Sequence, residues 1–180
     1  MIGIHSQMFS ALARTSSGGV PYNIGVDPLT STAVNATLER RWYGLALEVP
    51  TSGAVTEASI EVAFTGYLGY VGFAVYDSSK NLVGSKAIDP DDTTSRITFT
   101  GMNISVTGGN LYHFAVIGSI ASGSGSIKLI YNYFDPDNGL YASLDASAEP
   151  TSTTWSPPSS ISSLTFDNYI QIPMKITITT

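Results

Sequence analysis

From Arg41 onward the apolar side chains alternate with polar ones over short runs, and this period of two restricts the fold more than any other feature. In residues 70–76, for example, Val71, Phe73 and Val75 share one face while the opposite face is also apolar, as in a central strand. Gly, Pro, Asp, Asn and Ser end the runs, and such turn signals recur about every 8 to 12 residues. This spacing is typical of a sandwich or barrel rather than of alternating strands and helices.

We therefore predict an all-β protein, an antiparallel β-sandwich of jelly-roll type with an N-terminal arm and roughly ten to twelve strands. The polar residues 77–81 predict a hairpin turn between two of these strands. No long helix is expected after residue 15. The expected strands are residues 42–49, 59–65, 70–76, 82–88, 96–100, 111–119, 126–134, 140–144 and 171–179.

Residues 1–34 differ from the rest and are interpreted as an N-terminal arm or peripheral segment, with residues 35–180 as one sandwich domain. Ile4, Met8 and Leu12 have helical spacing, so this segment begins with either a short amphipathic helix or an extended arm. The apolar side chains of such an arm need a cover. They either pack along their own domain or contact a neighbouring subunit.

Charge and composition exclude several classes of partner. The chain has 180 residues, enough for one domain with a sizeable core, and its formal net charge of −6 gives a field that repels nucleic acid. It contains no Cys, and therefore neither a disulfide nor a thiolate zinc site. No apolar run reaches the roughly 20 residues that span a bilayer, and the first residues lack the pattern of a signal peptide. We expect no membrane insertion and no Sec export.

The residues that can carry chemistry form no recognisable catalytic motif. His5 lies in the arm, His113 lies within an expected strand where an imidazole satisfied by the sheet is the simpler interpretation, and there is no Gly-x-Ser-x-Gly sequence. The acidic residues 89–92 and 135–139 lie in turn sequences; the second group resembles the start of a calcium loop but lacks its later ligands. Gly72 and the glycines three and six residues before it lack dinucleotide-binding spacing and are expected to permit a bend or close sheet packing. We predict no enzymatic activity, no catalytic residues, no metal and no cofactor.

Aromatic side chains beside oxygen-rich ones give the candidate binding site. A Tyr or Trp ring can lie against the apolar face of a pyranose while neighbouring polar groups bond the sugar hydroxyls. One group surrounds the turn at residues 135–139, and the other lies in residues 146–163, the longest irregular stretch and the best candidate for an exposed loop. The alternative is that most of these rings fill the core. The candidate ligand-binding residues are Tyr131, Tyr133, Asp135, Asp137, Asn138, Tyr141 and Trp155.

Three segments resemble small β-sandwich modules of bacteriophage tail-fibre and other virion proteins. Residues 41–50, Arg-Trp-Tyr-Gly-Leu-Ala-Leu-Glu-Val-Pro, are similar to the opening of such modules, where an Arg and aromatics precede a strand ending in Val-Pro. Residues 71–83 are similar to their Tyr-Asp hairpin, and residues 109–116 are similar to their Gly-x-Tyr strand. The resemblance covers about residues 37–120, and His113 stands where those modules commonly carry a second aromatic.

The resemblance implies a non-enzymatic structural or adhesive virion protein of a tailed phage, assembled in the bacterial host cytoplasm and located in the virion. It also implies a homo-oligomer, preferably a trimer because fibre-like appendages use threefold symmetry, with other virion proteins and a host-surface glycan as partners. Similar hairpins occur in jelly-roll carbohydrate-binding modules of bacterial enzymes. A free carbohydrate-binding module is therefore the alternative, and a glycan-cleaving enzyme is a third interpretation.

Overall fold

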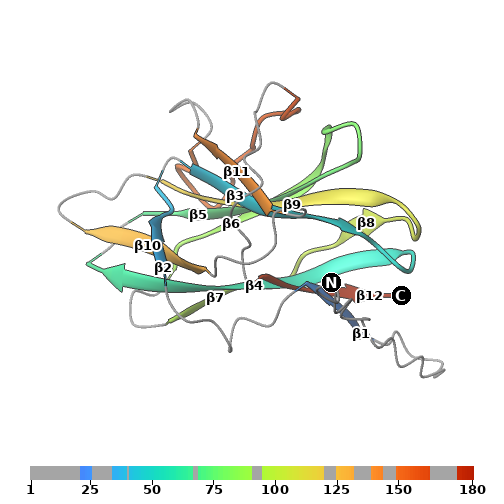
Figure 1. Ribbon diagram of the computed structural model, residues 1–180, viewed down its shortest axis with the longest axis horizontal. Helices are drawn as coiled ribbons and strands as arrows, with labels where there is room; N and C mark the ends of the chain where they lie inside the picture. Colours follow the sequence, from blue (N-terminus) through green and yellow to red (C-terminus); the bar gives the residue numbers. More distant parts are fainter. Residues whose placement is uncertain are drawn as a thin grey trace, which may run out of the picture.

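The computed structural model describes residues 21–25, 34–39, 41–66, 69–90, 95–119, 125–131, 139–143, 149–162 and 174–180. These residues form twelve β-strands and no helix. The strands lie in two antiparallel sheets that pack face to face (Figure 1). The predicted all-β sandwich is confirmed.

The larger sheet has seven strands: β1 (Pro21–Gly25), β2 (Val34–Thr37), β4 (Gly53–Thr65), β7 (Arg96–Phe99), β8 (Ile104–Val106), β10 (Ser126–Tyr131) and β12 (Met174–Thr179). Its order is β1-β12-β4-β10-β2, and β7 and β8 also pair with β4. With 13 residues, β4 is long enough to pair with four strands, namely β7, β8, β10 and β12. It is therefore the centre of this sheet.

The smaller sheet has the order β11-β3-β9-β5-β6, with β3 (Arg41–Glu48), β5 (Val71–Tyr76), β6 (Leu82–Ile88), β9 (Leu111–Gly118) and β11 (Gly139–Ser143). All six residues of β5 are buried, as expected of a strand covered on both faces. The predicted hairpin joins β5 to β6. Its turn is closed by two main-chain bonds, in which Asp77 N–H donates to Asn81 O and Lys80 N–H donates to Asp77 O, both at 2.9 Å.

The antiparallel pairs are nested along the chain. β1 pairs with β12, β3 pairs with β9, β4 pairs with β7 and β8, and β5 pairs with β6 in the middle. Because the first and third of these pairs belong to the seven-stranded sheet and the other two to the five-stranded sheet, the chain crosses repeatedly between the layers. β2, β10 and β11 are additions to this nested arrangement; β2 comes between β1 and β3, and β10 and β11 come between β9 and β12.

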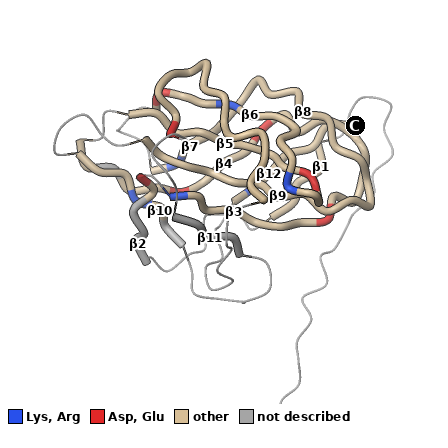
Figure 2. Tube along the Cα trace, turned by 90° about the horizontal axis from the view of Figure 1, so that it is seen from above, with Lys and Arg blue, Asp and Glu red and all other residues tan. Residues whose placement is uncertain are grey.

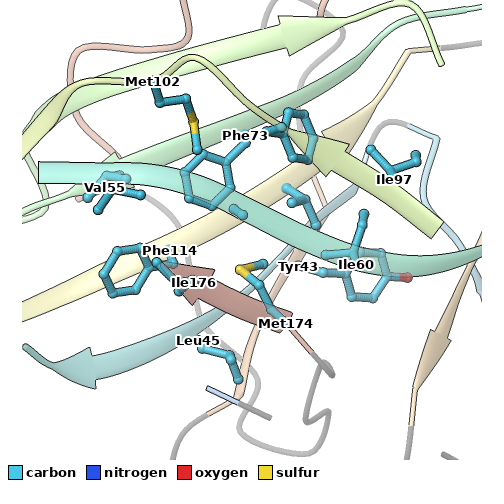
Figure 3. Close-up of a cluster of buried hydrophobic side chains, with 14 of the residues drawn as sticks. Tyr43, Leu45, Val55, Ile60, Phe73, Ile97, Met102, Phe114, Met174 and Ile176 are labelled. Carbon is cyan, nitrogen blue, oxygen red and sulfur yellow. The ribbon is translucent and has the colours of Figure 1, made fainter. Parts of the chain in front are cut away.

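The inward faces of the two sheets form the main core. Tyr43, Phe73 and Phe114 are almost fully buried there (Figure 3). Phe99 is fully buried as well, and its ring lies 5.5 Å from that of Phe73 between centroids, one ring coming from each sheet. Burying a side chain of this size contributes about 1.5–3 kcal/mol. Charged positions are few and scattered along the described strands (Figure 2). Packing of apolar side chains is therefore the main source of stability.

The structure adds strands that the alternation did not predict. β4 starts six residues earlier than expected. The pairing register shifts opposite Thr177 and Ile178, and this irregularity interrupts the alternation of buried and exposed residues in β4. Val55 is buried, and the next buried residue is Ala58, three positions later instead of two. β1, β2 and β8 have only three to five residues each, too few for a periodic pattern. β1 lies at the edge of its sheet, within the segment interpreted as peripheral. The helix or arm expected before residue 15 lies outside the described residues.

Candidate binding surface on the outer sheet face

The five-stranded sheet carries a second apolar cluster on the face turned away from the main core, called here the outer cluster. Alternate residues of β3, β5 and β9 supply it, because side chains of successive residues point to opposite faces of a strand. The cluster explains why β5 is buried on both faces. Its buried members are Trp42, Ala74, Tyr76, Ala115, Ile117 and Ile161, with Leu82 and Trp155 packed against them.

Residues 149–162, called here the strap, cover this cluster on the side away from the seven-stranded sheet (Figure 1). Ile161 N–H donates to Lys80 O at 3.0 Å, and Leu82 N–H donates to Ser159 O at 2.8 Å. These bonds flank an antiparallel bridge between Asn81 and Ser160. The strap is thus attached to the edge of the sheet where β6 begins.

Side chains make the second set of strap contacts. The Tyr76 hydroxyl donates to the carbonyl oxygen of Pro158 at 3.2 Å. Burial raises the pKa of the Tyr76 phenol well above its ordinary value of 10.0, so it remains a hydrogen-bond donor at neutral pH. Pro157 and Ile161 are buried as well. The expectation of an exposed loop therefore holds for only part of the segment.

Trp155 lies directly over Gly72 of β5. A Cβ atom placed on Gly72 would come within 2.4 Å of Cζ3 of the Trp155 ring, a distance that real Cβ contacts do not reach. The same ring lies 5.8 Å from that of Trp42, and Trp42 meets Tyr76 edge to face at 6.2 Å. Gly72 was expected to permit a bend or close packing of sheets; it instead permits the close approach of the Trp155 ring from the strap.

The exposed part of this surface is rich in hydroxyl groups and nearly free of charge. Trp155 is half-buried, and the flanking Thr154 and Ser156 are exposed. Ser152 Oγ and Thr154 Oγ1 are hydrogen-bonded at 3.0 Å. Glu149 is the one ionisable residue in the strap. An aromatic ring among hydroxyls can stack on an apolar ligand face while neighbouring oxygens bond polar groups.

Three ionisable residues, His113, Lys80 and Asp77, lie near the point where the strap is attached. His113 is buried within β9 and pairs with Tyr76 of the neighbouring strand β5. Burial lowers the pKa of His113, the nearby Lys80 lowers it further, and Asp77 opposes the shift. The pKa of Asp77 is itself lowered, chiefly because its carboxylate accepts the main-chain N–H of Asn81 at 2.8 Å.

The described residues bring only one of the predicted site residues, Trp155, into a defined side-chain environment. Tyr131 ends β10, where its backbone pairs with Val34, and Tyr141 lies in β11, where its backbone pairs with Tyr43. These two strands belong to different sheets, so Tyr131 and Tyr141 do not lie in one sheet. Tyr133, Asp135, Asp137 and Asn138 lie outside the described residues.

Sequence reasoning did not identify Trp42, Tyr76 and Gly72 as parts of this surface. The available signal was the β5 segment, whose two apolar faces require a cover on each side. Two apolar faces predict that other segments pack on both sides of β5, but they do not indicate which segment packs on the outer side. The strap has no periodic pattern because main-chain atoms make several of its contacts.

No protein-family model and no curated protein matches this chain. Within the described ranges, no three His, Asp or Glu side chains are close enough to hold a metal ion. The same residues contain no helix long and apolar enough to cross a membrane. The function is therefore argued from the surface itself.

Proposed function

We propose that the chain is a non-enzymatic adhesive or structural module that contacts an uncharged carbohydrate through the exposed part of Trp155. The observation that carries this proposal is the position of the ring, fixed from below by Gly72 and Trp42 and bordered by serine and threonine hydroxyls. A ring held in place loses little conformational freedom when a sugar stacks on it. One such contact contributes on the order of 1 kcal/mol, so several copies in an oligomer would supply useful avidity.

We further propose that the module belongs to a tailed-phage virion, as a homo-oligomer with a trimer preferred. The support is the resemblance of residues 41–50, 71–83 and 109–116 to tail-fibre modules, together with the fact that these segments contribute neighbouring strands of one sheet. A free carbohydrate-binding module is the second candidate, and the same Trp155 surface favours it equally. Mass spectrometry of purified phage particles distinguishes the two, because only a virion protein is present in them.

The nested strand pairs also support the jelly-roll type of sandwich. A jelly roll folds a long antiparallel hairpin of eight strands into two sheets. The pairs β1–β12, β3–β9, β4 with β7 and β8, and β5–β6 fit that description when β7 and β8 are counted as one interrupted strand. Jelly rolls include viral capsid and lectin domains, so the proposed setting and ligand are both familiar for the architecture.

The ligand contact is tested by measuring attachment of the full chain to a glycan array and to host cells. Trp155→Ala removes the stacking ring, and we expect it to reduce attachment. Ile161→Ala is the matched control, because it removes a buried strap contact and leaves the Trp155 ring in the chain. Equal loss in both variants, with both folded, would show that attachment needs only an intact strap; unchanged attachment in Trp155→Ala would refute the proposed contact.

A further inference from the structure

The turn between β5 and β6 connects His113 to the strap. His113 of β9 pairs with Tyr76 of the neighbouring strand β5, the last residue before the turn. His113 is 8% exposed. The turn then presents Lys80 O to the N–H of Ile161. A displacement of this turn would therefore break a strap attachment directly.

The closed arrangement is unfavourable for a positively charged imidazole. His113 has lost most of its water, and Lys80, in the turn that follows Tyr76, disfavours a second positive charge. The compensating group is Asp77 in the same turn. Tyr76 is neutral at the pH values concerned, and Glu48 lies on the same face of the adjoining strand β3 but is exposed to solvent. On the strap, the ionisable residue is Glu149, twelve positions before Ile161.

We propose that His113 is an acid-sensitive latch, whose protonation displaces the turn at residues 77–81 and releases the strap from the edge of β6. The imidazole takes up one proton from solvent, and the outward movement of the turn lets water reach the imidazolium and increases its distance from Lys80. Release exposes the outer cluster and removes the support beneath Trp155. This inference concerns the attachment of the strap and does not rest on the proposed ligand contact.

The pH range follows from linkage. The pKa of His113 is below its ordinary 6.5 when the strap is closed and returns toward 6.5 when it is open, so the open form binds the proton more tightly. The ratio of open to closed strap therefore rises by up to about tenfold per pH unit below about pH 6.5. It becomes constant once the closed form is protonated as well.

The absence of cysteine allows the opening to be measured with single introduced thiols. Ile161→Cys places a thiol at a buried strap position, Ser162→Cys gives an exposed reference beside it, and Val106→Cys reports the main core. Each variant is reacted between pH 7.5 and 4.5 with a dipyridyl disulfide, a reagent that modifies thiols in acid. We expect the rate at position 161, relative to that at position 162, to rise below about pH 6.5 while position 106 stays protected.

Two substitutions assign the effect to His113. His113→Gln should abolish the rise. Lys80→Gln should make the rise smaller, because Lys80 lowers the pKa of His113 in the closed form; without it the closed form is protonated at a higher pH and the ratio becomes constant sooner. Amide exchange at Ile161 in the unsubstituted chain gives the same readout if a variant does not fold. A rate at position 161 that is independent of pH, a rise that persists in His113→Gln, or parallel exposure of position 106 would each overturn the proposal.

Discussion

Substituting Gly72 by Ala tests whether the strap lies on β5 as closely as the structure indicates. The added Cβ would meet three ring carbons of Trp155 at 2.4, 2.7 and 2.8 Å, so the ring must move. Overpacking of this kind costs about 1–3 kcal/mol. Gly72 does not have a positive φ, so an Ala residue fits the backbone and recovers about 0.5–1 kcal/mol of strand stability. The net expectation is a loss of up to about 2.5 kcal/mol in the free energy of unfolding.

The same substitution should have the opposite sign when Trp155 is absent. In a Trp155→Ala background the three ring atoms nearest to the new methyl group are gone, so Gly72→Ala should stabilise the fold by about 0.5–1 kcal/mol. Urea unfolding followed by far-ultraviolet circular dichroism measures both values without depending on tryptophan fluorescence. The difference between the two backgrounds, about 1–3 kcal/mol, is the coupling between Gly72 and the ring.

Gly84 provides the matched control for this cycle. A Cβ on Gly84 would approach the side chain of Ile104 at 2.9 Å, in the other sheet and away from the strap. Gly84→Ala should therefore have the same effect with and without Trp155, to within about 0.3–0.5 kcal/mol. If Gly72→Ala also has the same effect in both backgrounds, the packing of Trp155 on β5 is wrong.

Three further predictions concern the core and the hairpin. Phe73→Ala should lower the free energy of unfolding by about 3–5 kcal/mol in urea titrations, because the ring is fully buried between the sheets; a loss below about 1 kcal/mol would contradict that placement. Tyr76→Phe should cost about 0.5–1.5 kcal/mol through loss of the bond to Pro158 O. The raised pKa of folded Tyr76 means that the unfolded chain ionises first, so wild-type stability should fall as pH rises above about 10, more steeply than in the variant. The lowered pKa of folded Asp77 has the opposite consequence. Its contribution to the free energy of unfolding is present above about pH 3.8 and is lost as the pH falls through the pKa of the folded state. Asp77→Asn should therefore make the loss of stability at acid pH less steep.

The hairpin and the main sandwich strands could be predicted because their information is local. Val71, Phe73 and Val75 alternate with their neighbours, and the polar residues 77–81 follow at once. Both the pairing of β5 with β6 and the burial of β5 follow from that pattern. Short strands such as β8 have too few residues to show any period.

The strap could not be predicted because its attachments are mostly main-chain atoms. Ser159 O and Ile161 N–H bind the edge of β6, and any residue except proline could supply the same two groups. Trp155 was identified from composition alone, as an aromatic residue in a polar segment. Its position depends on the missing side chain of Gly72, which lies 83 positions earlier in the chain and appears in the sequence only as one more glycine.

Amide hydrogen exchange across the strap at neutral pH tests the central structural claim most directly, because both the proposed ligand contact and the latch require residues 149–162 to be docked on the sheet. The N–H groups of Ile161 and Leu82 are bonded to Lys80 O and Ser159 O, so both should exchange far more slowly than unfolded peptide. The exposed residues Thr151 and Thr153 should exchange quickly in the same sample. Exchange at Ile161 as fast as at Thr153, while the amides of β5 remain protected, would show that the sandwich folds without the strap and would contradict the account.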